Sequence, residues 1–134
     1  MKCFLIDDDE DDREIFSLAL NAANSSSTYI TAINGEDSLR ILEELPDYIP
    51  DFIFLDLNMP FMDGPSCLKA LRKIPKLQDV PIIMFTTSSY TKDIEDTLKL
   101  GASHYLIKPT SLNDLVAILT SFFEGNRTSY QLNS

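Results

Sequence analysis

The chain has 134 residues, a formal net charge of −10 and a hydrophobic fraction of 44%. This length suits one domain with its own core and is too short for two. The hydrophobic fraction is typical of a globular protein and higher than that of a disordered chain. Because proteins bind nucleic acids and anionic membranes through Lys and Arg, the negative charge argues against both as partners.

Neither a secretion signal nor a membrane span is recognisable in the sequence. The acidic run that begins at Asp7 comes too early for the apolar core of a signal peptide, and no later apolar stretch reaches the length of a span. Cys3 and Cys67 lack the spacing of metal ligands, so we expect two reduced, buried thiols. These features predict a cytoplasmic protein.

Five short runs of aliphatic and aromatic residues alternate with segments of helical period, which is a βα rhythm repeated five times. The first, third and fourth runs are apolar without alternation, as expected for strands covered by helices on both faces. The predicted strands span residues 3–6, 29–33, 52–55, 82–85 and 105–107. The sequence therefore predicts an α/β fold around a parallel five-stranded sheet.

Apolar residues recur at helical spacing between these strands. Pro46 ends the second helix, and Ser111 with Asp114 is typical of a capping pair at the start of the last one. The helix expected over residues 94–100 is short and polar, which predicts weak anchoring. The other stripes are expected to face the core: Phe16, Ala19, Leu20 and Ala23; Leu39, Leu42 and Leu45; Cys67, Leu68 and Leu71; Leu112, Leu115, Leu119 and Phe122.

The domain organisation is simple. No linker, repeat or low-complexity block divides the chain, and the residues from Gly125 onward are polar enough to fray. We therefore expect one folded domain over residues 1–124 and a polar tail over residues 125–134, with no separate output domain.

Charged or hydroxyl side chains stand at the ends of four predicted strands. Asp7 and Asp8 come after the first strand and Asp56 after the third, while Thr86 and Lys108 come after the fourth and fifth. In an open parallel sheet, ligands bind beyond the carboxyl ends of the strands, where the strand order reverses. We therefore expect all five side chains to line one pocket.

The three carboxylates of this set need compensating positive charge. Each pair repels by roughly 4 kcal/mol at about 4 Å in an effective dielectric of about 20, and Lys108 together with a divalent cation can offset this. An all-oxygen ligand set favours a hard ion, and Mg²⁺ uses few carboxylates and leaves room for a phosphoryl oxygen. Because a carboxylate can attack phosphorus, Asp56 is a candidate phosphoacceptor.

Each of these residue types also has an ordinary structural interpretation. Negative charge in the first turn of a helix is favourable, which accounts for Asp11 and Asp12 but not for Asp7 and Asp8 at a strand end. A lone Thr, a Tyr or a Lys-Pro pair is common in loops and cores, but their joint placement favours a functional role. His104 has no partner in the sequence, and we interpret it as solvent-facing.

Four segments of the chain carry a recognisable pattern. In chain order they are Ile6-Asp7-Asp8-Asp9; Phe54-Leu55-Asp56-Leu57-Asn58-Met59-Pro60 with Met62-Asp63-Gly64; Phe85-Thr86; and Gly101-Ala102-Ser103-His104-Tyr105-Leu106-Ile107-Lys108-Pro109. Together they resemble the receiver domains of two-component response regulators. The resemblance extends from about Lys2 to Glu124, and it implies a (βα)5 doubly wound, flavodoxin-like receiver of the stand-alone type, with strand order 2-1-3-4-5.

The resemblance also implies a metal-dependent phosphorylation site. A histidine kinase or a phosphotransfer protein would phosphorylate Asp56, and Mg²⁺ would be held by Asp8, Asp56 and the backbone carbonyl of Asn58. Asp7 would act largely through a metal-bound water. The chain would then be a phosphoacceptor switch that assists its own phosphorylation and dephosphorylation, and not an enzyme.

The implied switch consists of residues that respond to the phosphoryl group. Lys108 would pair with one phosphoryl oxygen, Thr86 would donate a hydrogen bond to another, and Tyr105 would change rotamer. A downstream protein would bind the face formed by the fourth helix, the fifth strand and the fifth helix. The resemblance leaves open whether the chain is a monomer or a weak homodimer.

Thr87 departs from the small residue that receivers often carry after the switch Thr or Ser. Its β-branched side chain is expected to narrow access to the phosphoryl group. We therefore predict that it alters phosphoryl transfer from the donor, hydrolysis, or both.

Three other functions fit the sequence less well. A phosphatase of the haloacid dehalogenase type would need a second acid where Asn58 stands, and room for a cap domain. A pseudo-receiver that only binds a partner would have a broken acidic pocket. A nucleotide-binding domain would need a Gly-rich loop after the first strand.

Overall fold

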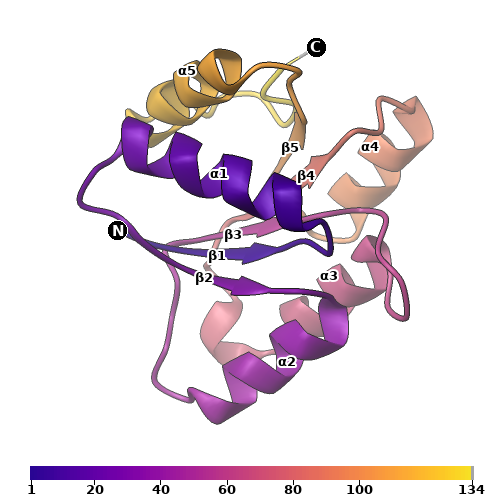
Figure 1. Cartoon of the computed structure of the whole chain (residues 1–134). Coiled ribbons are helices and arrows are strands. Elements are labelled where there is room, and N and C mark those ends of the chain that lie inside the picture. Colours follow the sequence, from indigo (N-terminus) through magenta and orange to yellow (C-terminus); the bar gives the residue numbers. More distant parts are fainter. Residues whose placement is uncertain (134) are drawn as a thin grey trace.

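A sheet of five parallel strands lies between two layers of helices in the computed structural model, which describes residues 1–133 (Figure 1). The strand order is β2-β1-β3-β4-β5, so the order reverses between β1 and β3. This confirms the predicted fold class and strand order. The strands are β1 (Lys2–Ile6), β2 (Thr28–Ala32), β3 (Phe52–Leu55), β4 (Ile82–Thr86) and β5 (His104–Ile107).

The helices divide between the two faces of the sheet and bury one apolar cluster on each (Figure 1). α1 (Glu10–Ala23) and α5 (Leu112–Phe123) cover one face, where the rings of Phe16 and Phe54 lie 4.8 Å apart. The other face is covered by α2 (Gly35–Glu44), α3 (Gly64–Arg72), a short 3-10 turn (Pro75–Leu77) and α4 (Thr91–Lys99). Within residues 1–133, no helix combines the length and apolar character that crossing a bilayer requires.

The helix starts show why α4 differs from the rest. A side-chain oxygen of the residue before each of α1, α2, α3 and α5 accepts a hydrogen bond from a backbone N–H of the first turn, as a capping residue does. For α5 the pair is Ser111 and Asp114, as the sequence predicts. α4 follows Tyr90 without such a cap, and Thr97 is its one fully buried residue in the described chain. α4 is therefore the most weakly anchored helix, as predicted.

The prediction that the residues after Gly125 fray is wrong for part of this segment. Tyr130 to Asn133 run beside β5, and a parallel bridge pairs Gln131 with Tyr105. β5 is an edge strand of the main sheet, so its outer N–H and C=O groups need partners. The segment supplies them despite its polar composition.

Candidate functional site

The carboxyl ends of four strands bring the predicted polar residues to one edge of the sheet. The backbone continues the pairing pattern past the strand ends, because the N–H of Asp7 donates to the carbonyl of Ala32 and the N–H of Asp56 donates to Ile6. On the other side, the N–H of Lys108 donates to the carbonyl of Thr86 at 2.7 Å. These backbone contacts fix the spacing of the side chains that follow.

Three carboxylates form an acidic cluster at this edge. Asp7, Asp8 and Asp56 each offer one oxygen, and these oxygens all lie within 4.8 Å of one another. Asp7 and Asp56 are buried, whereas Asp8 is exposed and keeps the cluster open to water. An all-oxygen set with one solvent-facing member fits a hard divalent cation that retains water ligands, and Mg²⁺ is such an ion.

Lys108 balances this cluster from the opposite side. Its Nζ lies 2.9 Å from Oδ2 of Asp7, 2.7 Å from Oδ2 of Asp12 and 3.8 Å from Oδ2 of Asp56. Burial opposes the ammonium charge, but the hydrogen bonds to Asp12 and Asp7 outweigh it and raise the pKa of Lys108. The ammonium also lies 5.3 Å from the ring centre of Phe85. Lys108 is therefore held charged next to the candidate phosphoacceptor.

Asp12 also belongs to the site, although the sequence predicts for it only a favourable negative charge in the first turn of a helix. In the structure its carboxylate makes the shortest ion pair with Lys108. One signal in the sequence points to this: Asp12 lies four residues before Phe16 and extends the buried stripe of α1 by one turn. That spacing turns Asp12 toward the sheet edge, while its neighbour Asp11 does not share the stripe.

Burial makes the ionised form of Asp56 costly in the metal-free protein. It raises the pKa of Asp56 from 3.8 to about 6; Lys108 opposes the rise, and the negative charge of Asp7 adds to it. Burial also raises the pKa of Asp7, against the hydrogen bond from Lys108. One oxygen of Asp56 accepts the N–H of Leu57 at 2.8 Å, which fixes the carboxylate plane. The site thus holds a buried carboxylate whose negative charge is only partly compensated.

The two predicted switch residues meet at a residue that the sequence did not single out. Thr86 is buried, and its Oγ1 accepts the N–H of Ser88 at 3.3 Å. The hydroxyl of Tyr105, which is also buried, donates to the carbonyl of Ser88 at 2.9 Å. The hydroxyl of Ser88 donates to Asp93 in the first turn of α4 at 2.6 Å. Ser88 therefore connects Thr86, Tyr105 and α4.

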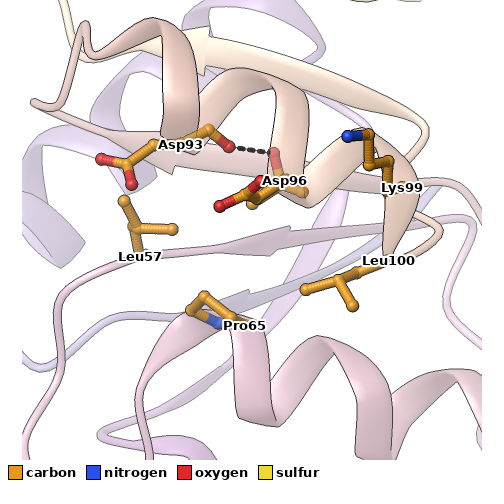
Figure 2. Close-up of a pocket in the computed structure, with 7 residues that line it drawn as sticks. Leu57, Pro65, Asp93, Asp96, Lys99 and Leu100 are labelled. Atoms are coloured by element: carbon orange, nitrogen blue, oxygen red, sulfur yellow. Dashed lines mark hydrogen bonds between the residues drawn. The ribbon is translucent and has the colours of Figure 1, made fainter.

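A cavity of about 340 Å³ lies between α3 and α4 (Figure 2). Leu57, which follows Asp56, and Pro65 of α3 form one side of it. The α4 side is formed by Asp93, Asp96, Thr97 and Lys99, with Leu100 at the end of the helix. Because α4 borders this open volume, a shift of α4 needs little repacking of the core.

The two remaining residues of the predicted site, Asn58 and Thr87, lie at its solvent side. Both are exposed: Asn58 lies three residues after the end of β3, and Thr87 directly follows the last residue of β4. This places the side chain of Thr87 next to Thr86 in the loop that leads to α4, where incoming molecules can meet it.

Gly64 holds the loop between β3 and α3 against the acidic cluster. A Cβ at this position would lie 2.5 Å from the carbonyl oxygen of Asp56 and 2.6 Å from Cα of Leu57. These are backbone atoms that cannot move without moving Asp56 itself. The N–H of Gly64 also donates to the carbonyl of Leu57 at 2.8 Å. The close approach therefore requires glycine.

Gly64→Ala is expected to lower the free energy of unfolding by about 2 kcal/mol, because the added methyl group must displace the backbone of Asp56 and Leu57. Urea denaturation measures this loss. Ser66→Ala is the matched control, since Ser66 is exposed in the first turn of the same helix and caps nothing with its side chain. Equal stability of the two variants would show that the close packing at Gly64 is unimportant.

Comparison with known proteins identifies the family. The model of the response regulator receiver domain matches residues 3–120. The transcriptional regulatory protein PrrA of Mycobacterium leprae is 38% identical over 116 residues, which are 87% of this chain and 47% of PrrA. A protein-glutamate methylesterase/protein-glutamine glutaminase of Methanococcoides burtonii is 31% identical over 135 residues, covering 99% of this chain and 37% of that protein. The chain thus spans less than half the length of these two relatives.

The similarity to solved structures also extends over nearly the whole chain. The phosphorylated cyanobacterial phytochrome response regulator RcpA superposes with a TM-score of 0.83 and 27% identity, over 95% of this chain and 96% of RcpA. The family model, the strand order and the sheet-edge cluster all agree. This chain belongs to the response regulator receiver domain family.

Proposed function

We propose that the chain is a phosphorylation-dependent signalling switch in which Asp56 accepts a phosphoryl group from a histidine kinase or a phosphotransfer protein. The observation that carries this proposal is the position of Asp56, which is buried, shares the acidic cluster with Asp7 and Asp8, and lies 3.8 Å from Nζ of Lys108. A carboxylate nucleophile in such a place gains from the positive charge of Lys108 and of a bound cation when it attacks a phosphoryl group.

The phosphoryl transfer is a single displacement. A carboxylate oxygen of Asp56 forms a bond to phosphorus while the bond between phosphorus and the donor's imidazole nitrogen breaks, and the imidazole then takes a proton from water. Lys108 is near enough to pair with a phosphoryl oxygen. Asp8, Asp56 and the carbonyl of Asn58 would hold Mg²⁺, with Asp7 acting through water, and this ion supplies positive charge to the phosphoryl oxygens.

The response is proposed to begin at Thr86. Its hydroxyl donates to the new phosphoryl group and leaves the N–H of Ser88, with which it is paired in the unphosphorylated structure. Tyr105 and α4 are both attached to Ser88, so both respond. The face formed by α4, β5 and α5 then presents a changed surface to a downstream protein.

The chain is proposed to act in the cytoplasm as a phosphoacceptor and not as an enzyme. Residues 1–124 would be the receiver unit, and residues 125–134 an appended segment. The receiver unit would be a monomer or weak homodimer without affinity of its own for nucleic acid or membrane, in line with the net charge of −10.

Incubation with acetyl phosphate and Mg²⁺, followed by measurement of the intact mass, tests the proposal. We expect the wild-type mass to rise by one phosphoryl group, and Asp56→Asn to show no change. Asp79→Asn is the matched control, since Asp79 is exposed and lies away from the cluster. The proposal fails if the wild-type protein is unlabelled or if Asp56→Asn is labelled to the same extent.

Thr87→Ala is predicted to change the rate of phosphoryl transfer from acetyl phosphate, the rate of hydrolysis, or both. The alanine removes a β-branched side chain from the exposed position beside Thr86, which widens access to the phosphoryl group. The decay of the labelled mass after removal of the donor gives the hydrolysis rate. Rates equal to those of the wild type in both directions would remove any role of Thr87 in access.

A further inference from the structure

The outer edge of β5 is occupied by a later segment of the same chain. The N–H of Tyr105 donates to the carbonyl of Tyr130, and the N–H of Leu132 donates to the carbonyl of Tyr105, both at 2.8 Å. The side chain of Asn133 continues the pairing: its Oδ1 accepts the N–H of Ile107 at 2.9 Å, and its Nδ2 donates to the carbonyl of Ile107 at 2.8 Å. The segment thus satisfies the edge as an added strand would.

Side chains attach the same segment to α4 and to β5. The hydroxyl of Tyr130 lies 2.7 Å from the hydroxyl of Thr97, the buried residue of α4. The rings of Tyr130 and Tyr105 have centres 6.3 Å apart. The Nδ1–H of His104 donates to the carbonyl of Ser129 at 2.9 Å, since a carbonyl can only accept. His104, predicted to face solvent, is half-buried and contacts the segment.

The two residues that the side chain of Tyr130 contacts, Thr97 and Tyr105, are both connected to the proposed phosphorylation site through Ser88. Tyr105 donates to the carbonyl of Ser88, and the hydroxyl of Ser88 holds Asp93 at the start of α4. Thr97 lies one turn further along α4, where its hydroxyl donates to the carbonyl of Asp93 at 2.8 Å. The structure thus contains a contiguous series of contacts from Thr86 to Tyr130.

We propose that residues 129–133 are an internal ligand of the β5 edge, and that phosphorylation of Asp56 loosens this ligand and uncovers the edge. The freed N–H and C=O groups of Tyr105 and Ile107 would then accept an extended segment of a partner protein as an added strand. This inference rests on the proposed function, because it takes phosphorylation of Asp56 as its trigger.

The direction of the effect follows from the contacts of Thr86. We expect the side chain of Thr86 to rotate toward the phosphoryl oxygen and so to lose the 3.3 Å contact in which its hydroxyl accepts the N–H of Ser88. Without this hydrogen bond the backbone of Ser88 is free to move. The carbonyl of Ser88, which accepts the hydroxyl of Tyr105, then moves with it. Ser88 also holds α4 through Asp93, so we expect α4 to shift as well. Because α4 borders a cavity, this shift needs little repacking, and it carries Thr97 away from Tyr130. Without the Thr97 contact, only the backbone pairing and Asn133 hold the segment, so it opens from the β5 edge more often.

Hydrogen exchange of the backbone amides, read by NMR on the full chain, tests this inference. With acetyl phosphate and Mg²⁺, the N–H groups of Tyr105, Ile107 and Leu132 are expected to exchange roughly fivefold faster or more, since loss of one hydrogen bond alone corresponds to about this factor. In Asp56→Asn the same additions are expected to change nothing. The intact mass, measured on the same sample, shows whether Asp56 is phosphorylated.

Two variants check that the exchange of the edge amides depends on the segment. Asn133→Ala removes both hydrogen bonds to Ile107 and is expected to speed exchange at that amide without phosphorylation. Asn126→Ala is the matched control, because Asn126 bonds Ser121 at the end of α5 and not the β5 edge. Coupling between the sites is reciprocal, so Asn133→Ala and not Asn126→Ala should also be phosphorylated to a higher level at a limiting concentration of acetyl phosphate.

The possible results separate this inference from the proposed function. If the mass shows no phosphoryl group, the proposed function fails and the inference fails with it. If the mass shows the phosphoryl group but exchange at Tyr105, Ile107 and Leu132 is unchanged or slower, the inference alone is overturned. The inference is also overturned if Asn133→Ala exchanges at Ile107 like Asn126→Ala.

Discussion

Replacement of Lys108 by Met is expected to lower the free energy of unfolding by about 3 kcal/mol at neutral pH, the size of the loss when one partner of a buried ion pair is removed. The side chain of Lys108 is 10% exposed and contacts three carboxylates, of which Asp7 is fully buried. Without the ammonium these negative charges repel one another. Urea denaturation at constant ionic strength measures the loss.

The same variant is expected to be labelled by acetyl phosphate roughly 100-fold more slowly, because a positioned charge that stabilises the transferring group is missing. Lys73→Met is the matched control, since Lys73 is exposed and lies at the end of α3, away from the acidic cluster. A Lys108→Met protein as stable as this control at neutral pH would mean that Lys108 does not neutralise the cluster.

Asp56→Asn is expected to stabilise the metal-free protein by about 2 kcal/mol above pH 7. Burial raises the pKa of Asp56 from 3.8 to about 6, a difference that corresponds to about 3 kcal/mol. Part of this gain is lost because the amide must find its own hydrogen bonds. Lys108 keeps its two shorter ion pairs, to Asp7 and Asp12, so the substitution leaves the rest of the cluster in place.

The pH dependence of this gain follows from the direction of the shift. Because the pKa of Asp56 is higher in the folded protein, the folded state binds more protons between the two pKa values, and stability falls as the pH rises through this range. The wild type and Asp56→Asn should therefore have similar stability at the acidic end and diverge toward neutral pH. A difference that is constant over this range would contradict burial of the charge as its cause.

Millimolar Mg²⁺ is the control for the same pair of proteins. If the cation binds through Asp56, it stabilises the wild type more than Asp56→Asn and reduces the difference between them. A difference unaffected by Mg²⁺ would argue against Asp56 as a ligand.

Much of the fold and part of the site could be predicted because they depend on local patterns. Apolar runs of strand length and stripes at helical spacing determine the order of the elements, and parallel strands bring their carboxyl ends together whatever the details of packing. This is why the order of residues along the chain suffices to place Asp56, Thr86 and Lys108 at one edge of the sheet. The capping pair at Ser111 is equally local.

The features that the sequence did not predict depend on contacts between distant residues. Asp12 becomes part of the site because Lys108, 96 residues later, reaches it. Tyr130 is not part of any apolar stripe in the sequence. Its position depends on its contact with Thr97 and on the outer edge of β5, which no strand of the main sheet covers. Leu45 fits the stripe of the second helix, yet it follows the last turn of α2 and is exposed.

Chemical localisation of the phosphoryl group tests the central claim most directly. Borohydride reduces an aspartyl phosphate to homoserine, so protein treated with acetyl phosphate and Mg²⁺, then reduced and digested, can be sequenced by mass spectrometry. The proposed function predicts homoserine at position 56 and at none of the other aspartates, including Asp7, Asp8 and Asp12 of the same cluster. Homoserine at any other position in place of 56, or its absence throughout, would contradict Asp56 as the phosphoacceptor.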